Sequence, residues 1–372
     1  MKIGVMLRHY DQHGGGVKVY TENLLRELIA LPTHHEFIFI YRNPRLVGTY
    51  NGKMGIREIA IGAPSIFLWD QLSIRQVEER EKFDLIFNPK YSVPLTARCR
   101  TVFVCHGLDW YVMPRGSRWF DRLSHRYLIP RYAKKADAVI AVSNTTRQHV
   151  IEYLGVDESR VHTVYLGVDE AFKKPIPQGK LAAIRSAYRL PERFYLYVGQ
   201  IYPPKNFGRL LKAYARVGPK LGIPLVVAGE HRWLCGEELA LVDQLGISAW
   251  VVRPGWIDRD TLPCFYALAE ALLLPSLYEA CPIPILEAMS SGCPVVTANR
   301  YGTQELVGQA GVLVDPEDMD SIADGMSRLV SDDSLRKQLI EAGQKRAQNF
   351  SWEKCARETL SVLESAMRQG RR

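Results

Sequence analysis

Charged side chains that suit a phosphorylated ligand stand in two segments of the C-terminal half of the chain. Lys205 follows a short apolar run in the segment Gly199-Gln-Ile-Tyr-Pro-Pro-Lys-Asn206. Prolines stiffen this loop and an ammonium is a point charge suited to a diphosphate, with a solvated surface lysine as the alternative. Glu279 is expected in a loop after a buried strand, and Glu287 in the first turn of the next helix. The two carboxylates either contact different parts of one elongated ligand or face solvent.

Two further candidates lie in the N-terminal half. Gly14, Gly15 and Gly16 follow the first apolar run and open the first helix, where backbone amides approach an anion closely. Their spacing matches neither GxGxxG nor GxxxxGK[ST], so phosphate contact and a plain flexible loop are both open. His106 follows the apolar run 101–105. It either contacts a substrate hydroxyl or is satisfied by a nearby carbonyl.

Metal-binding patterns are weak in this sequence. The triplets Asp258-Arg-Asp260 and Asp318-Met-Asp320 each stand where a turn leads into a helix, which favours helix capping over metal binding. The seven cysteines occur singly, so neither a zinc site nor a disulfide framework is expected, and a reducing cytoplasm fits. We expect no metal and no other cofactor.

Composition narrows the class of protein. The chain has 372 residues, of which 47% are hydrophobic and 24% charged, which excludes a disordered, collagen-like or small disulfide-stapled protein. A net charge of +8 favours anionic partners: nucleotides, nucleic acid or an acidic membrane face. No apolar run is long enough to span a bilayer, and the run near Met1 is too short for a signal peptide. A cytoplasmic protein is expected.

The elements that position these residues are short strands alternating with amphipathic helices. Continuous β-branched runs indicate strands covered on both faces, as in a parallel sheet. The expected strands are 3–6, 37–40, 56–61, 85–87, 101–105, 139–142, 161–164, 194–198, 225–228, 251–252, 271–274, 295–297 and 312–314. This pattern predicts an α/β protein with two doubly wound, Rossmann-like domains facing across a cleft. We expect domains over 1–172 and 181–350, a Pro- and Lys-rich linker over 173–180, and a final helix over 351–372 that returns to the first domain.

Taken together, the segments from Leu274 to Asp315 resemble the signature of family 4 glycosyltransferases of GT-B fold. The pieces are Pro275-Ser-Leu-Tyr-Glu279, Pro284-Ile-Leu-Glu-Ala-Met289, Gly292-Cys-Pro-Val-Val296, Gly302-Thr-Gln-Glu305 and Gly311-Val-Leu-Val-Asp315. The glycine loop, the His106 segment, Val164-Tyr-Leu-Gly-Val-Asp169 and Pro204-Lys-Asn206 follow the family's order. The similarity covers nearly the whole chain.

The resemblance implies a role for each candidate. Lys205 resembles the residue on the donor diphosphate, Glu287 the carboxylate that accepts from both ribose hydroxyls, and Glu279 the one that contacts a hydroxyl of the donor sugar. His106 matches the histidine near the reacting sugar. The family's remaining contacts to the nucleotide sugar are backbone ones, and they fall on Gly15, Gly16, Cys281, Ile283, Gly255, Trp256 and Ile257.

The sequence departs from the family pattern in two places. Where the family usually has Glu-Gly-Phe-Gly, this chain has Glu279-Ala-Cys-Pro282, so the backbone N–H at position 282 is lost. In the family an arginine often follows the glycine of the loop that carries the lysine. This chain has Gln200 at that position, and Arg209 is a candidate to supply the missing cation.

A basic and aromatic stretch between Trp110 and Lys135 stands outside these motifs. It carries seven cations and six aromatic residues against one acidic residue, Asp121. Either it lies on an anionic membrane and meets a lipid-linked acceptor, or it is a solvated helix with its aromatics in the core.

The resemblance implies a retaining, metal-independent transfer of a mannose- or glucose-type hexose from a nucleotide sugar. The acceptor is expected to be a saccharide or lipid-linked, in cell-surface polysaccharide or glycolipid biosynthesis. The protein is expected to be cytoplasmic, and a membrane contact of the basic stretch would make it peripheral on the inner face of the membrane. Two alternatives stay open: a nucleotide-sugar epimerase of the same fold, and a non-catalytic binder of glycans or nucleotides. The basic residues match no nucleic-acid recognition module, so nucleic acid is not an expected partner.

Overall fold

The computed structural model describes residues 1–10, 15–114, 119–229 and 236–368. The chain forms two compact units, Gly167–Ser351 and Met1–Leu166 together with the C-terminal segment from Trp352. The predicted linker 173–180 therefore lies inside the second unit. Phe172, at the end of the 3₁₀ turn η5 (Glu170–Phe172), is already buried there, and Gln178 opens α7 (Gln178–Ala187).

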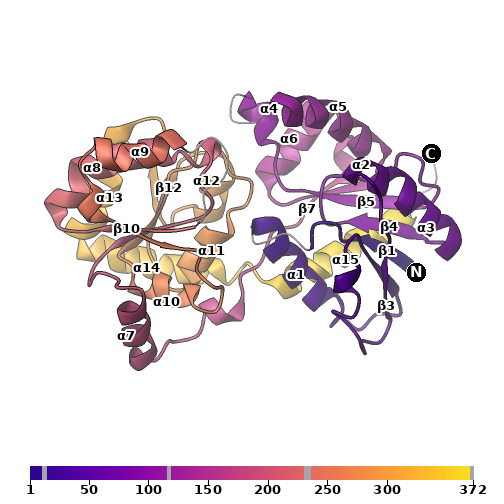
Figure 1. Cartoon of the computed structure of the whole chain (residues 1–372), viewed down its shortest axis with the longest axis horizontal. Helices are drawn as coiled ribbons and strands as arrows, with labels where there is room; N and C mark the ends of the chain where they lie inside the picture. The colour runs from indigo at the N-terminus through magenta and orange to yellow at the C-terminus, as the bar shows by residue number, and fades with distance from the viewer. Residues whose placement is uncertain (11–14, 115–118, 230–235, 369–372) are drawn as a thin grey trace. The chain divides into compact units, whose positions relative to one another are not determined.

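The first unit contains a seven-stranded parallel sheet in the order β3-β2-β1-β4-β5-β6-β7 (Figure 1). Its strands are β1 (Lys2–Met6), β2 (Glu36–Tyr41), β3 (Ile56–Ala60), β4 (Leu85–Asn88), β5 (Arg100–Cys105), β6 (Ala138–Ala141) and β7 (Val161–Thr163). Its helices are α1 (Gly16–Leu28), α2 (Ile66–Leu68), α3 (Ile74–Glu81), α4 (Asp109–Val112), α5 (Trp119–Lys135), α6 (Asn144–Leu154) and α15 (Trp352–Arg368). The strand order reverses between β1 and β4.

The second unit contains a six-stranded parallel sheet in the order β10-β9-β8-β11-β12-β13. Its strands are β8 (Tyr195–Val198), β9 (Leu225–Ala228), β10 (Val251–Gly255), β11 (Ala271–Leu274), β12 (Val295–Ala298) and β13 (Val312–Val314). The other helices are α8 (Phe207–Leu221), α9 (Gly236–Gln244), α10 (Leu262–Leu268), α11 (Ile283–Ser290), α12 (Tyr301–Val307), α13 (Met319–Ser331) and α14 (Asp333–Ala347). Here the order reverses between β8 and β11.

Every expected strand is present, with bounds that differ by a few residues at most. Six of them, β4, β6, β8, β9, β11 and β12, are buried along their whole length, because helices cover both faces of each sheet. The two doubly wound sheets that the continuous apolar runs predict are thereby confirmed.

The last helix of the chain packs against the first one. The rings of Tyr20 on α1 and Trp352 on α15 lie 6.1 Å apart, centroid to centroid, and Figure 1 shows α15 beside α1. Val168 and Ser351, at the two ends of the second unit, pair through a parallel β-bridge. None of the helices in the described part of the chain combines the length and apolar character that crossing a bilayer requires.

Candidate active site

The loop that carries Lys205 is fixed at the point where the strand order of the second sheet reverses. Lys205 ends the 3₁₀ turn η6 (Pro203–Lys205) after β8. Asn206 then adopts a left-handed conformation (φ 60°), and its side-chain amide donates to the carbonyls of Pro275 (2.9 Å) and Pro316 (2.6 Å). Because ligands of such sheets bind beyond the strand ends at this reversal, Lys205 stands in the position where a ligand is expected.

Glu279 follows β11, the other strand at the reversal, and pairs with Lys205. The Lys205 Nζ atom lies 2.5 Å from Glu279 Oε1, and both side chains are about nine-tenths buried. Ser276 Oγ donates to the same carboxylate oxygen at 2.8 Å. The structure thus brings together two residues that lie 74 positions apart in sequence and holds them with an ion pair.

Glu287 lies on α11 and is 2% exposed. It is the fifth residue of a helix that begins at Ile283, so the expected place in the first turn is wrong by one residue. Arg259 Nη1 donates to Glu287 Oε1 at 2.8 Å, and the Tyr266 hydroxyl donates to Oε2 at 2.9 Å. Burial raises the pKa of Glu287, while Arg259 and Tyr266 act to lower this pKa.

The segment before α11 offers fewer backbone donors than an ordinary helix start. Pro282 occupies the N-cap and Pro284 the second helical position, and neither has an N–H. The Ile285 N–H is already used by the Pro282 carbonyl at 3.1 Å. The backbone contacts expected at Cys281 and Ile283 flank this proline and stay predictions.

The expected base-binding segment ends β10. Gly255 has a φ of 82°, and its carbonyl accepts from the Gly229 N–H at 3.1 Å. Trp256 is 50% exposed, while Ile257 is buried. The exposed indole offers a flat apolar surface at the same sheet edge as the Lys205 loop.

Gly302, the second residue of α12, supports the Glu279 loop. Its N–H donates to the Glu279 carbonyl at 3.0 Å. A Cβ atom added here would lie 1.9 Å from the Ala280 carbonyl oxygen. The loop and the helix therefore approach as closely as they do because residue 302 has no side chain.

We expect Gly302→Ala to lower the free energy of unfolding by about 1–3 kcal/mol, because the Glu279–Ala280 backbone must move. Gly179→Ala is the matched control, since a Cβ on α7 meets open space. Thermal unfolding of both variants checks this, and an equal midpoint for Gly302→Ala and wild type contradicts it.

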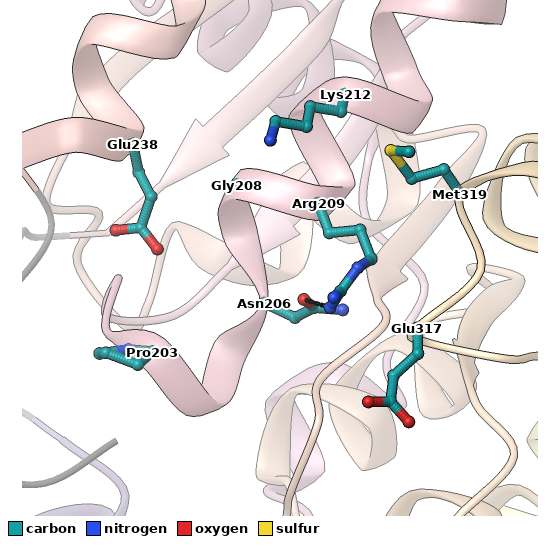
Figure 2. Close-up of a pocket in the computed structure, with 8 residues that line it drawn as sticks. All are labelled: Pro203, Asn206, Gly208, Arg209, Lys212, Glu238, Glu317 and Met319. Atoms are coloured by element: carbon teal, nitrogen blue, oxygen red, sulfur yellow. Dashed lines mark hydrogen bonds between the residues drawn. The ribbon is translucent and has the colours of Figure 1, made fainter. Parts of the chain in front are cut away.

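Arg209 on α8 contacts the residue that follows Lys205 and the loop after β13. Its guanidinium donates to Asn206 Oδ1 at 2.7 Å and to the Pro316 carbonyl at 3.4 Å. It faces a separate cavity of about 510 Å³ (Figure 2), lined by Pro203, Asn206, Gly208, Arg209, Lys212, Glu238, Glu317 and Met319. Lys205 is not among these residues, and the hydrogen bond to the Pro316 carbonyl lets Arg209 hold the loop after β13.

The remaining site candidates lie in the first unit, at the carboxyl edge of its sheet. Gly15 is the N-cap of α1 with a φ of 99°, a conformation that glycine adopts readily, and Gly16 begins the helix. Gly14 lies outside the described residues. His106 follows β5, and its Nε2 lies 2.7 Å from the Pro89 carbonyl oxygen.

The environment of His106 keeps the imidazole neutral. Burial, opposed by the Pro89 carbonyl and assisted by the charge of Lys90, lowers the pKa of His106 to about 4. Because a carbonyl only accepts, the neutral ring carries its proton on Nε2 and leaves Nδ1 as an acceptor. Both sequence interpretations of His106 are thus compatible: a carbonyl satisfies one nitrogen, and the other accepts from a hydroxyl.

This pKa predicts how stability depends on pH. Between about pH 6.5 and pH 4 the unfolded chain binds a proton at His106 that the folded chain does not, so stability falls as the pH falls through this window. The contribution is at most about 3 kcal/mol. Calorimetry should show a smaller decrease in melting temperature for His106→Gln than for wild type over this range; identical slopes contradict the assignment.

The sequence interpretation missed Arg259 and Tyr266. It expected Asp258 to cap a helix, but α10 has Thr261 at its N-cap and no side-chain cap, and Asp258 accepts through its backbone carbonyl. Asp318 does cap α13, as predicted, by accepting from Asp320 N at 2.8 Å. The position of Arg259 between Asp258 and Asp260 is the signal in the sequence that could have identified it as a site residue.

Within the described ranges, no group of three or more His, Cys, Asp or Glu side chains is arranged to hold a metal ion.

Comparison with known proteins identifies the family to which this chain belongs. The family described as Glycosyltransferase Family 4 matches residues 14–172, and the family described as Glycosyl transferases group 1 matches residues 183–346. The chain belongs to the group 1 glycosyltransferases of family 4. Lys205, Glu279 and Glu287 all fall inside the group 1 match.

Relatives of this glycosyltransferase include the O-antigen chain mannosyltransferase B of Escherichia coli, 29% identical over 76% of this chain and 75% of the relative. Another is an N-acetylgalactosamine-N,N'-diacetylbacillosaminyl-diphospho-undecaprenol 4-alpha-N-acetylgalactosaminyltransferase of Campylobacter jejuni. It is 29% identical over 66% of this chain and 64% of its own length.

Among solved structures, the Anabaena protein Alr3699/HepE in complex with UDP and glucose superposes with a TM-score of 0.77. The match covers 98% of this chain and all of that chain at 19% identity. The fold is thus that of the GT-B glycosyltransferases.

Proposed function

We propose that this glycosyltransferase moves a hexose of mannose or glucose type from a nucleoside diphosphate sugar to a saccharide or lipid-linked acceptor. The observation that carries the proposal is the placement of Lys205 and Glu279 on either side of the strand reversal in the second sheet, with Glu287 on the helix that follows. At this edge the Lys205 ammonium suits a diphosphate, the Glu287 carboxylate suits a ribose, and the Glu279 carboxylate suits a sugar hydroxyl.

The choice of donor sugar draws on relatives. The Escherichia coli relative is named a mannosyltransferase, and the Anabaena structure was solved with UDP and glucose. Mannose and glucose are both hexoses. Pathways that build cell-surface polysaccharide or glycolipid are the setting we propose for the reaction.

The proposed chemistry stabilises a leaving diphosphate. Negative charge grows on the diphosphate as its bond to the sugar breaks, and the Lys205 ammonium and the Cys281 and Ile283 amides are fixed donors for it. No metal is needed in this scheme. We propose that the configuration at the anomeric carbon is retained through attack on the face that the diphosphate leaves. NMR of the product tests this, and an inverted anomer contradicts it.

The acceptor is proposed to bind the first unit. Lys90, after β4, lies close enough to His9 and His106 for its charge to lower the pKa of both. Arg8 pairs with the buried Asp70 (Nε to Oδ1, 2.9 Å) beside Arg42. Lys90 and Arg42 supply positive charge at the sheet reversal, which suits an acceptor that carries a phosphate. The Campylobacter jejuni relative is named for a diphospho-undecaprenol acceptor.

Contact with an anionic membrane is a further part of the proposal. On α5, Tyr127 is 60% exposed under the guanidinium of Arg131, which lies 3.5 Å from the ring centroid, and Lys134 and Lys135 are exposed as well. Trp110, by contrast, is buried in the core. The side chains of 115–124, including Arg115, Arg118 and Arg122, lie outside the described residues. Flotation with liposomes that differ in anionic lipid tests this contact, and binding independent of anionic lipid contradicts it.

The decisive experiment is to incubate the protein with a panel of UDP- and GDP-sugars and follow binding, slow hydrolysis and transfer. Hydrolysis or transfer supports the proposal. Epimerised sugar without an acceptor indicates the epimerase alternative. Nucleotide binding with neither product indicates a non-catalytic binder, which the loss of an amide at Pro282 favours.

A further inference from the structure

Arg259 is an arginine with unused hydrogen-bonding capacity at the centre of the candidate site. It lies between β10 and α10, and its Cζ atom is 5.2 Å from the ring centroid of Phe172. One nitrogen, Nη1, donates to Glu287. The other two, Nε and Nη2, are buried and have no hydrogen-bond partner among the described residues. A buried, charged donor without an acceptor is costly, so such atoms point to a ligand that supplies acceptors.

The carboxylate of Glu287 is held in one orientation. Arg259 occupies one direction at Oε1 (2.8 Å), and Tyr266 occupies one at Oε2 (2.9 Å). Each carboxylate oxygen has about two lone-pair directions, so each keeps one for a further donor. Two free directions on one fixed carboxylate match a pair of neighbouring hydroxyls, as on a ribose.

We infer that Arg259 is part of the nucleotide site. It holds Glu287 in the ionised state that accepts from two hydroxyls, and it donates its own Nε–H and Nη2–H to oxygens of a nucleoside diphosphate. This inference rests on the proposed function, because it takes the ligand of Glu287 to be a nucleotide.

The charges around Glu287 explain why the arginine is needed. Burial is the largest effect on this carboxyl and raises its pKa. Three titratable groups face it from different elements: Arg259 lowers the pKa most, the Tyr266 hydroxyl on α10 lowers it too, and Asp169 before η5 raises it. Without Arg259, the carboxyl takes up a proton at a higher pH. A protonated Glu287 donates through one oxygen and no longer accepts equally from both hydroxyls.

The test measures binding of UDP and of GDP to the full chain by calorimetry at about pH 6 and about pH 8.5. We expect Arg259→Gln to weaken binding of the nucleotide at least tenfold at the lower pH, and less at the higher pH, where Glu287 ionises again. The nucleotide affinity of the wild-type protein should change less between the two pH values. A purely structural defect weakens binding equally at both values, so the pH dependence is the informative readout.

A lysine at the same position separates the two roles of Arg259. Arg259→Lys keeps the charge beside Glu287, so we expect the flat pH profile of wild type. It lacks Nε–H and the planar fork, so we expect affinity reduced severalfold at both pH values. Wild-type affinity in Arg259→Lys would overturn direct donation by the guanidinium.

The matched control is Arg216→Gln, which removes an arginine paired with Asp320 on the surface of the same unit. It should bind like wild type. If Arg259→Gln binds within twofold of wild type at both pH values, the inference fails while the proposed function stands. If wild type binds neither UDP nor GDP, the proposed function itself fails.

Discussion

Lys205→Ala should lower kcat for hexose transfer by about 10²–10³-fold, the usual cost of removing one fixed group that stabilises developing charge. The ammonium stands at the strand reversal, beside the edge where the diphosphate of the donor is proposed to lie. Because charge on that diphosphate increases as the bond to the sugar breaks, the loss should be larger in kcat than in nucleotide affinity. Steady-state kinetics with the preferred nucleotide sugar measures both.

Removing Lys205 also leaves Glu279 buried without its partner, and breaking such a pair costs about 3–5 kcal/mol of stability. A double variant, Lys205→Met with Glu279→Gln, removes both charges at similar volume and separates the two effects. It should unfold near the wild-type temperature and still fail to transfer. Lys212→Ala is the matched single control, since Lys212 is an exposed lysine on α8 that lines the cavity of Figure 2. Near-normal rates for Lys205→Ala would refute the assignment.

Glu287→Ala should weaken nucleotide binding by about 10²–10⁴-fold. Two hydrogen bonds from ribose hydroxyls to one carboxylate are lost, each worth about 1.5–3 kcal/mol. The effect should appear in the affinity for the nucleotide alone, without any acceptor, which distinguishes this residue from Lys205. Calorimetry with UDP and GDP measures it.

Alanine at position 287 also strands Arg259 and Tyr266, so a second variant is needed. Glu287→Gln keeps an acceptor for one of them and nearly the same volume. We expect it to stay folded and to lose roughly tenfold or more in affinity, because one of the two accepting oxygens becomes a donor. Binding at wild-type strength by a folded Glu287→Gln would exclude the ribose role.

The sheets were predictable because their signal is local. A run such as Leu225–Ala228 or Ala271–Leu274 is apolar without alternation, which only a strand covered on both faces explains. Lys205 and Glu279 could be placed at strand ends for the same reason. Membership of one family then followed from the combination of segments rather than from any single one.

Pairings between side chains could not be predicted in this way. Nothing local indicates that Lys205 and Glu279 touch, because their proximity depends on which two strands flank the reversal of the sheet. The contact between Arg259 and Glu287 could not be predicted for the same reason, because Glu287 lies on a helix beyond the next strand. The predicted domain boundary is wrong because a Pro- and Lys-rich composition does not by itself mark a linker. Buried Phe172, just before this stretch, already belongs to the second unit.

The return of α15 to α1 has a consequence for how this chain is made. The second unit is one continuous stretch that ends at Ser351, whereas the first unit lacks the cover of α1 until Trp352 and the residues after it have been synthesised. During translation, all residues of the second unit are therefore synthesised before the first unit has all of its own. The flank of α1 therefore stays uncovered until α15 has emerged from the ribosome.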